Sequence, residues 1–289
     1  EDISMIDARK KRRIVVGDVH GELDIFREII RNAGLIDTKE RWAGGDNILI
    51  QTGDVIDRGP RSVDSFDFLR QLQKEAIKTG GEVIRLCGNH ELMILQGLFY
   101  FTNIVEPYEF ADVLRGEISK GDVVASYTDG ERLYTHAGLR SSIAERLFDD
   151  IKSINPNMND EDIDLYLLSD YINRIFRASV ESGELRQHPI FHIDWSRGGG
   201  DPVGGIFWCD FSSISLSEKA CDIPQIFGHT PTGKNELKTA HELKLINVDA
   251  GMYRLYGGRM VYLEITSEGV LIQHSKKSGD WTMAVLKRK

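Results

Sequence analysis

Three short, largely apolar segments near the start of the chain constrain the fold most, because each is followed, directly or after one residue, by a glycine and polar side chains. The segments are residues 13–16, 47–51 and 82–87. The loops after them are residues 17–21 (Gly-Asp-Val-His-Gly), 53–59 (Gly-Asp-Val-Ile-Asp-Arg-Gly) and 88–91 (Gly-Asn-His-Glu). Short apolar runs bounded by such loops predict buried strands.

Helical patterns separate these predicted strands. Apolar side chains between residues 23 and 30 form one stripe, which Gly34 ends, and a second stripe runs through residues 63–76 to Gly80. Strands that alternate with helices of this length indicate βαβ units and parallel pairing. Because the carboxyl ends of parallel strands share one edge of an open sheet, we expect the three polar loops to converge there.

The second half of the chain has a different pattern. Two strand patterns within residues 123–135 are joined by Asp129-Gly130, which is a strong hairpin signal. A helix-rich, acidic stretch follows from about residue 140, and strand patterns return at residues 225–227, 245–248 and 260–263. We therefore predict one α/β domain over residues 1–289, a sandwich with a helix-rich insertion at about 140–205.

The charge balance argues against a general nucleic-acid-binding protein. The 289 residues include 36 Lys and Arg against 45 Asp and Glu, a net charge of −9, whereas nucleic-acid binders present a basic surface. Basic clusters occur at residues 9–13 and 287–289, and we expect both to be solvated. No nucleic-acid partner is therefore expected.

Two further features bear on location. No apolar run approaches the ~18 residues that a membrane-spanning helix needs, so no span is expected. The three cysteines, Cys87, Cys209 and Cys221, lack C-x-x-C spacing and favour a reducing compartment. The cytoplasm is the expected location, although a secreted effector acting inside a host cell is also compatible with the sequence.

The polar loops predict a metal site. Asp18 and His20 flank one residue of an extended chain, so both side chains can point to one side, and His136 and His229 each follow another apolar strand. Carboxylate, amide and imidazole ligands together suit divalent manganese, iron or zinc. Two such ions ~3.5–4 Å apart need a carboxylate between them, and Asp54 is the natural bridging ligand.

A glycine directly precedes a proposed ligand in four of these loops. These glycines are Gly17, Gly53, Gly88 and Gly228. Because glycine readily adopts positive φ, we expect them to permit tight turns.

Together these motifs resemble the signature of the phosphoprotein phosphatase (PPP) group of calcineurin-like metallophosphoesterases. The resemblance is concentrated in residues 17–91, with single motifs at His136 and His229. Residues 85–93 (Arg-Leu-Cys-Gly-Asn-His-Glu-Leu-Met) look most like bacterial or Shewanella-like members. The resemblance implies a central β-sandwich flanked by helices, with a dinuclear metal centre on one rim.

The resemblance also implies a role for each motif residue. The ligands of the first metal would be Asp18, His20 and Asp54. The ligands of the second would be Asp54, Asn89, His136 and His229. The two ions would be manganese, with iron or zinc as alternatives, and a hydroxide bridging them would attack phosphorus. His90 would be the general acid, Asp57 would orient it, and Arg58 would bind the phosphoryl oxygens together with Asn89.

One element of the family pattern is missing. Bacterial members usually carry a second phosphate-binding Arg where this chain reads Trp-Cys-Asp at residues 208–210, and no Arg lies between there and His229. Arg197 could take this role from a different loop. Weaker alternatives are Arg140, Arg174 and Arg177.

The resemblance implies a metal-dependent protein phosphatase that acts on phosphomonoesters of Ser/Thr, Tyr or both, with a phosphoprotein or phosphopeptide as its partner. One alternative is hydrolysis of dinucleoside polyphosphates or RNA caps, and another is an inactive family member that serves as an interaction module. Residues 228–235 nearly match a nucleotide-binding loop, but Asn235 replaces the hydroxyl residue that the loop requires. The sequence leaves the substrate preference, the native metals and the oligomeric state open.

Overall fold

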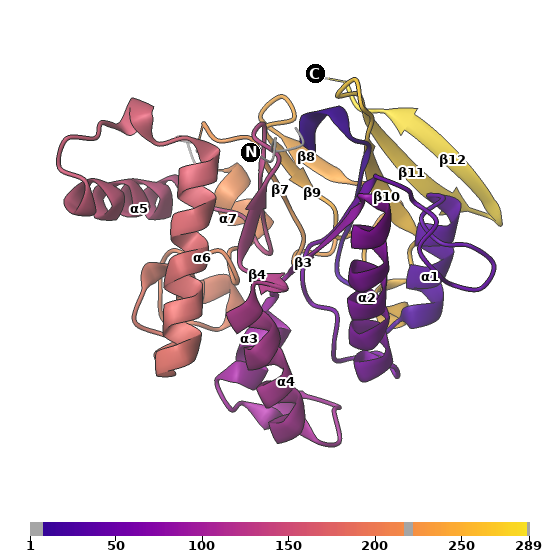
Figure 1. Cartoon of the computed structure of the whole chain (residues 1–289), viewed down its shortest axis with the longest axis horizontal. Helices are drawn as coiled ribbons and strands as arrows, with labels where there is room; N and C mark the ends of the chain where they lie inside the picture. Colours follow the sequence, from indigo (N-terminus) through magenta and orange to yellow (C-terminus); the bar gives the residue numbers. More distant parts are fainter. Residues whose placement is uncertain (1–7, 217–221, 288–289) are drawn as a thin grey trace.

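The computed structural model describes residues 8–216 and 222–287. Cys221 and the C-terminal Arg288 and Lys289 therefore lie outside the described residues. The described chain forms two β-sheets with helices on their outer sides (Figure 1). No helix among the described residues is long and apolar enough to cross a membrane.

The larger sheet has seven strands, and its centre is parallel. Its strands in spatial order are β12 (Asp280–Val285), β11 (Leu271–Lys277), β10 (Val261–Ile265), β1 (Arg13–Val16), β2 (Ile48–Gln51), β3 (Glu82–Leu86) and β4 (Val123–Val124). Strands β1 to β4 pair in parallel, and β10 to β12 add an antiparallel edge. The predicted parallel core is therefore present.

The smaller sheet has five strands. In spatial order they are β5 (Ser126–Thr128), β6 (Leu133–Thr135), β7 (Gln225–Phe227), β9 (Leu245–Asn247) and β8 (Lys238–Ala240). Alternate residues of each central strand face opposite layers. Val15 and Ile50 pack against the second sheet, whereas Ile14 and Leu49 belong to the core beneath the helices. This two-sided burial explains why these strands carry apolar side chains on both faces.

Helices cover the outer sides of the sheets. The α-helices are α1 (Leu23–Asn32), α2 (Ser62–Ala76), α3 (Asn89–Leu95), α4 (Pro107–Lys120), α5 (Ser141–Ile154), α6 (Leu165–Ser182) and α7 (Phe211–Ser215). Short 3₁₀ turns are η1 (Ala8–Lys10), η2 (Ile77–Thr79), η3 (Phe99–Phe101), η4 (Asp160–Asp162), η5 (Pro189–Phe191), η6 (Trp195–Arg197) and η7 (Arg254–Tyr256). Figure 1 shows α1 and α2 on one side of the molecule and α5 and α6 on the other. The division into a single domain with an insertion at 140–205 stays a prediction.

The hairpin prediction for residues 123–135 is correct in its second part only. Ser126–Thr128 pairs antiparallel with β6, but Val123–Val124 pairs with β3 in the other sheet. The chain changes sheet at Ala125, where the Asn173 side chain accepts the amides of Ala125 and Ser126 at 2.9 and 3.0 Å. A side chain of α6 thus replaces the strand partner that the backbone lacks at this crossing.

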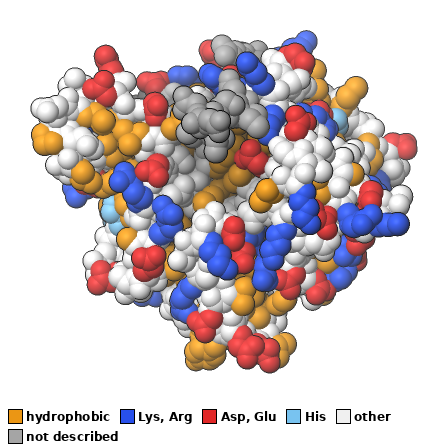
Figure 2. Space-filling model, viewed as in Figure 1, with side chains coloured by type: hydrophobic (Ala, Val, Ile, Leu, Met, Phe, Trp, Pro, Cys, Tyr) orange, Lys and Arg blue, Asp and Glu red, His pale blue; other side chains and the backbone are white. Residues whose placement is uncertain are grey.

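The expectation that residues 9–13 are solvated is wrong for Lys11, which is buried, and for Arg13, which is fully buried. The Arg13 side chain pairs across the two sheets. Its Nη1 donates to Asp129 Oδ2 at 3.0 Å, and the Tyr134 hydroxyl donates to the same oxygen at 2.7 Å. Arg13 lies in β1 and Tyr134 in β6, so this cluster connects the two sheets. Elsewhere on the surface seen in Figure 2, basic and acidic side chains are interspersed.

Replacing Asp129 by Asn should destabilise the protein, because it leaves the buried Arg13 guanidinium without a counter-charge. Breaking a buried ion pair on one side costs about 3–5 kcal/mol of unfolding free energy, which urea denaturation at neutral pH measures. Asp112→Asn is the matched control: its partner Arg115 is exposed on α4, so a change of at most about 0.5 kcal/mol is expected. Equal stability of Asp129→Asn and the unaltered protein would contradict this role.

Candidate metal centre

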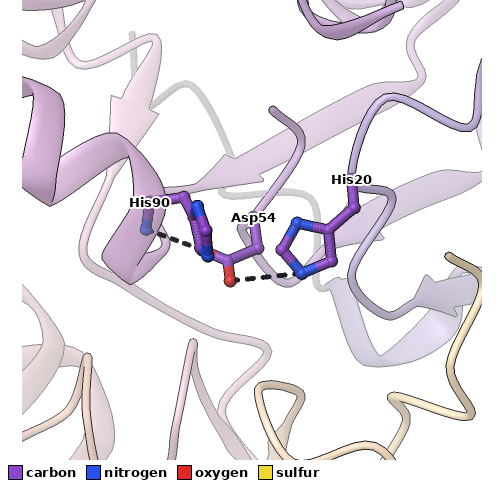
Figure 3. A group of neighbouring side chains, drawn as sticks. All are labelled: His20, Asp54 and His90. Carbon is purple, nitrogen blue, oxygen red and sulfur yellow. Dashed lines mark hydrogen bonds and ion pairs between the residues drawn. The ribbon is translucent and has the colours of Figure 1, made fainter. Parts of the chain in front are cut away.

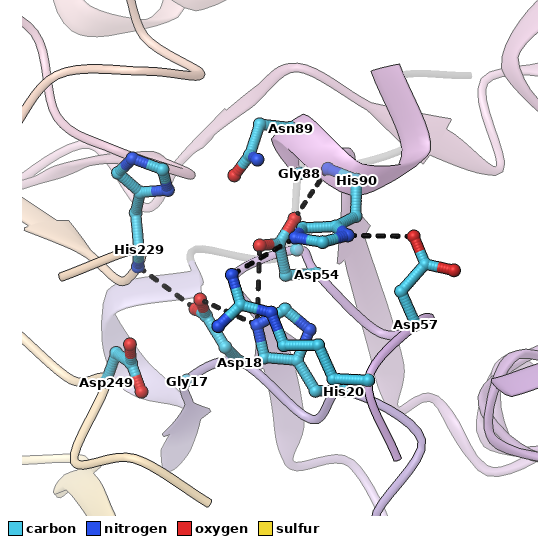
Figure 4. Close-up of polar contacts among 12 residues, drawn as sticks. Gly17, Asp18, His20, Asp54, Asp57, Gly88, Asn89, His90, His229 and Asp249 are labelled. Atoms are coloured by element: carbon cyan, nitrogen blue, oxygen red, sulfur yellow. Dashed lines mark hydrogen bonds and ion pairs between the residues drawn. The ribbon is translucent and has the colours of Figure 1, made fainter. Parts of the chain in front are cut away.

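The polar loops after β1, β2 and β3 meet at the carboxyl edge of these parallel strands, as the sequence predicts. The amides of Val19 and His20 donate to the Asp54 carbonyl at 3.0 and 2.9 Å, which joins the first loop to the second. His136 and His229 follow β6 and β7, which are also parallel neighbours. Figure 4 shows side chains from the loops after β1, β2, β3 and β7 pointing into one space.

Asp54 lies at the centre of this space. Its Oδ2 is 3.6 Å from His20 Nε2, and its Oδ1 is 3.6 Å from His136 Nε2. Asp54 belongs to two groups of closely spaced ligand atoms, one with His20 and His90 (Figure 3) and one with His136 and His229. A carboxylate shared between two groups of ligands is the geometry that a pair of metal ions requires.

The remaining predicted ligands border these groups. Asn89 Oδ1 lies 2.9 Å from His136 Nε2. Asp18 Oδ2 lies 3.9 Å from His20 Nε2, while its Oδ1 accepts the backbone amide of His229 at 3.0 Å. The structure thus brings all six predicted ligands together.

The histidine rings are oriented as metal ligands usually are. His20 Nδ1 lies 3.0 Å from the Ile56 carbonyl and His136 Nδ1 lies 2.8 Å from the Thr52 carbonyl. A carbonyl can only accept, so each Nδ1 carries the hydrogen, and each Nε2 turns its lone pair toward Asp54. His229 Nε2 is buried and has no hydrogen-bond partner among the residues that the structure describes. His136 Nε2 also lies 3.1 Å from His229 Nδ1, so imidazole nitrogens and a carboxylate oxygen converge here, as the ligands of a bound cation do.

Burial keeps these imidazoles neutral, as metal binding requires. It lowers the pKa of His20 to about 3, against the attraction of Asp54. Burial likewise lowers the pKa of His136 and takes the pKa of His229 well below its usual value, helped there by His136 and Arg197. The lone pairs are therefore available at neutral pH.

For the buried carboxyl groups of the site, burial opposes ionisation. Burial raises the pKa of Asp18 well above its usual value, and Asp249 and Asp54 raise it further. Burial also opposes ionisation of Asp54, but four surrounding imidazoles outweigh it and lower the pKa of that carboxyl. Buried carboxyl groups this close together suit a divalent cation.

Five site residues hold a strained backbone conformation. Positive φ angles of 47° to 70° occur at His20, Asp54, Asp57, Arg58 and His229. Residues other than glycine rarely adopt this region, and such strain persists only where the surroundings enforce it. Its concentration here indicates that the loops are shaped for the site.

The glycines preceding the ligands act mainly through close packing rather than through turns. Of the four, Gly53 alone has a positive φ, at +98°. A Cβ on Gly88 would collide with Asp54 Oδ1, and a Cβ on Gly228 would collide with Asp18 Oδ1. The expectation of tight turns therefore holds for Gly53. Gly88 and Gly228 instead allow a carboxylate oxygen to approach the backbone, and Gly17 allows the backbone of Val248 to do so.

The predicted acid–base residues lie beside the ligands. His90 Nδ1 lies 2.7 Å from Asp57 Oδ2, and the His90 amide donates to Asp54 Oδ1 at 2.9 Å. Burial lowers the pKa of His90, but Asp54 and Asp57 outweigh it and raise the pKa above its ordinary value. Arg58 Nη2 lies 3.3 Å from His90 Nε2. The guanidinium of Arg58 and the predicted proton donor His90 therefore lie side by side at the edge of the site.

Arg197 lies next to the second group of ligands. Its Nη2 donates to Asp210 Oδ2 at 2.7 Å and to Thr230 Oγ1 at 2.8 Å. Thr230 follows His229, and the charge of Arg197 contributes to the lowered pKa of His229. The weaker alternative Arg174 instead pairs with Asp170 on the exposed face of α6.

The sequence reasoning missed two residues at the site. Asp249 is buried, and its pKa is raised to about 7 by burial and by Asp54. It directly follows the predicted strand at 245–248, a position like that of the predicted ligands, but Val248 and not a glycine precedes it. Tyr256 accepts a hydrogen bond from Arg58 Nη1 and stacks on that guanidinium. It is the last residue of the 3₁₀ turn η7, and no sequence pattern singles it out.

Comparison with known proteins identifies the family. Residues 11–233 match the profile of the calcineurin-like phosphoesterases. The chain belongs to this family. Family membership implies divalent metal ions, and the ligand set of this phosphoesterase fits them.

Two relatives are Shewanella-like protein phosphatases. The phosphoesterase is 41% identical over 93 residues to Shewanella-like protein phosphatase 2 of Arabidopsis thaliana, a match to 32% of the chain and 24% of the relative. It is 42% identical over 90 residues to Shewanella-like protein phosphatase 1 of Plasmodium berghei, covering 31% and 25%. The predicted likeness to Shewanella-like members is confirmed there, although the match spans only about a quarter of each relative's length.

A solved structure confirms the fold class. The phosphoesterase superposes on the cold-active protein-tyrosine phosphatase of a psychrophilic Shewanella species with a TM-score of 0.70 and 22% identity. This match covers 96% of the phosphoesterase and 80% of the other chain. At that identity the likeness establishes the shared α/β sandwich.

The raised pKa of Asp249 predicts a pH-dependent effect of Asp249→Asn in metal-free protein. A carboxyl pKa of about 7 in the folded state, against 3.8 ordinarily, means that the native state holds a proton that the unfolded chain releases. Its contribution to stability is lost as pH rises through 7. Asn does not titrate, so the variant should gain stability over the unaltered protein from about pH 4 to 8.

Urea denaturation in chelator at several pH values measures this difference. Asp280→Asn, on the exposed strand β12, is the control. Parallel stability curves for Asp249→Asn and the unaltered protein would show that Asp249 ionises freely in the fold.

Proposed function

We propose that this phosphoesterase is a metal-dependent protein phosphatase that hydrolyses phosphomonoesters on Ser/Thr, Tyr or both. The observation that carries the proposal is the shared carboxylate Asp54, flanked by two groups of ligands and adjoined by the His90–Asp57 pair. The names of the relatives support it, because two are protein phosphatases and a structural neighbour is a protein-tyrosine phosphatase.

The proposed cofactors are two divalent ions, manganese first and iron or zinc as alternatives. One would be held by Asp18, His20 and Asp54, and the other by Asp54, Asn89, His136 and His229. Mixed oxygen and imidazole donors suit these metals. When bound, such ions polarise the phosphoryl group and acidify a water molecule.

The protein's own residues bind the phosphate and deliver a proton. Arg58 lies beside His90 at the edge of the site, where its planar guanidinium can hold two phosphoryl oxygens. Because Asp57 holds His90 Nδ1, the Nε2 atom faces the site and can protonate the leaving oxygen. The raised pKa of His90, which Asp54 and Asp57 cause against the effect of burial, keeps that proton available near neutral pH.

His90→Asn should lower kcat for p-nitrophenyl phosphate and for phosphopeptides by about 10²–10⁴-fold, the usual contribution of a general acid. Asp54→Asn should abolish both manganese binding and turnover, because it removes the shared carboxylate. Circular dichroism checks that both variants remain folded, and metal analysis checks loading. Unchanged turnover in either variant would contradict the proposed function. An unaltered protein that neither binds metal nor hydrolyses substrate would indicate an inactive interaction module.

The same assay separates the alternative substrates. A panel of phosphoserine, phosphothreonine and phosphotyrosine peptides is run beside diadenosine tetraphosphate and capped RNA, with manganese and with chelator. Faster hydrolysis of the dinucleotide or the cap would replace the phosphatase proposal.

Arg197 is proposed as the second phosphate-binding cation. Arg197→Ala should raise KM for a phosphopeptide about tenfold or more, the effect of one lost hydrogen bond to a charged group. Arg174→Ala, which removes an exposed Arg of α6, should leave KM unchanged. Equal KM values in all three proteins would exclude Arg197 from substrate binding.

A further inference from the structure

The Asp57–His90 pair contacts a segment outside every motif described above. This segment, residues 102–104, lies between η3 and α4. Thr102 Oγ1 donates to Asp57 Oδ1 at 2.5 Å, while the other carboxylate oxygen of Asp57 lies 2.7 Å from His90 Nδ1. A continuous chain of hydrogen bonds therefore runs from Thr102 through Asp57 to His90.

Two contacts determine the direction of the hydrogen bond between Thr102 and Asp57. The backbone amide of Ile104 donates to Thr102 Oγ1 at 3.1 Å, so this oxygen already serves as an acceptor there. A hydroxyl group has a single hydrogen, and a carboxylate offers only lone pairs. The Thr102 hydrogen is thus committed to Asp57.

The adjacent Asn103 holds the backbone of the same loop. Its Nδ2 donates to the Gly59 carbonyl at 2.7 Å, and its Oδ1 accepts from Ser62 Oγ at 2.7 Å. Ser62 Oγ in turn accepts the Asp57 amide at 2.8 Å. Asp57 has a positive φ of 67°, so a backbone that would otherwise relax is held from outside the loop.

We propose that Thr102 is a positioning residue for proton transfer, which fixes the Asp57 carboxylate and thereby the aim of His90. This inference rests on the proposed function. In that step the His90 Nε2–H bond breaks and its proton passes to the leaving oxygen. The bond between this oxygen and phosphorus breaks with its electron pair kept by the oxygen, and a water-derived oxygen bonds to phosphorus in its place. Without the Thr102 hydroxyl, one Asp57 oxygen loses its donor and the carboxylate can rotate away from His90. Proton transfer depends on such alignment.

The experiment uses substrates that differ in their need for a proton. The metal-loaded protein is assayed with 2,4-dinitrophenyl, p-nitrophenyl and phenyl phosphate, whose leaving oxygens are increasingly basic. Thr102→Val keeps the side-chain shape and removes the hydroxyl. It should lower kcat about tenfold on phenyl phosphate, a fraction of the full general-acid effect, and change kcat by less than about twofold on 2,4-dinitrophenyl phosphate. KM should stay the same.

Three further variants decide between positioning and structure. Thr102→Ser restores the hydroxyl and should restore the rate on phenyl phosphate, whereas Thr79→Val, a matched change on an exposed turn, should have no effect. In a His90→Asn background, Thr102→Val should cost nothing more, because the group it positions is gone. Melting temperatures with manganese confirm that each protein is folded.

The outcomes are distinct. A loss of rate equal on all three substrates, or one that persists in the His90→Asn background, would show a structural role and overturn the inference. Wild-type rates in Thr102→Val would overturn it as well. If His90→Asn itself showed no dependence on the leaving group, the general-acid part of the proposed function would fail instead.

Discussion

The site depends first on the buried carboxylate of Glu91. Its oxygens accept the amides of Gly88 at 2.9 Å, Asp54 at 3.0 Å and Val55 at 2.9 Å. These amides lie beyond the ends of β2 and β3, where the sheet no longer supplies acceptors and unpaired donors would be costly. Burial and the charge of Asp54 raise the pKa of Glu91 to about 7. One side chain thus joins two loops and holds Asp54 between the ligands on either side.

Close packing of one loop on the next completes the arrangement. Asp54 Oδ1 occupies the place that a side chain on Gly88 would take, and Asp18 Oδ1 occupies the corresponding place at Gly228. Each carboxylate also accepts the amide of the histidine that shortly follows that glycine, His90 or His229. The loops therefore depend on one another, because each of these two glycines makes room for a predicted ligand of another loop. A single added methyl group would displace a predicted metal ligand rather than merely strain a turn.

Much of this site follows from local sequence, and the remainder does not. Strand patterns ending in Gly-Asp or Gly-Asn predict both the parallel core and the converging ligands, since each needs only a few neighbouring residues. Thr102 and Arg13 could not be found that way, because their partners lie 45 and 116 residues away and no periodicity links them. Strand β12 is largely exposed, so it lacks the apolar pattern that identifies a buried strand. Asp249 is an intermediate case, because its strand-end position was visible and its role was not.

The charge of the protein has to be judged at the site rather than over the whole chain. The net charge of −9 would repel a phosphate ester if it were spread evenly over the surface. Three of the acidic groups, Asp18, Asp54 and Asp249, are buried around the proposed metals, and two divalent ions would place about +4 against them. Arg58 and Arg197 add two more positive charges at the edge. Loading with metal would therefore change the local field from negative to positive, so protons and metal ions compete for the same carboxylates. The attraction of a phosphate ester would then arise only in the metal-loaded protein.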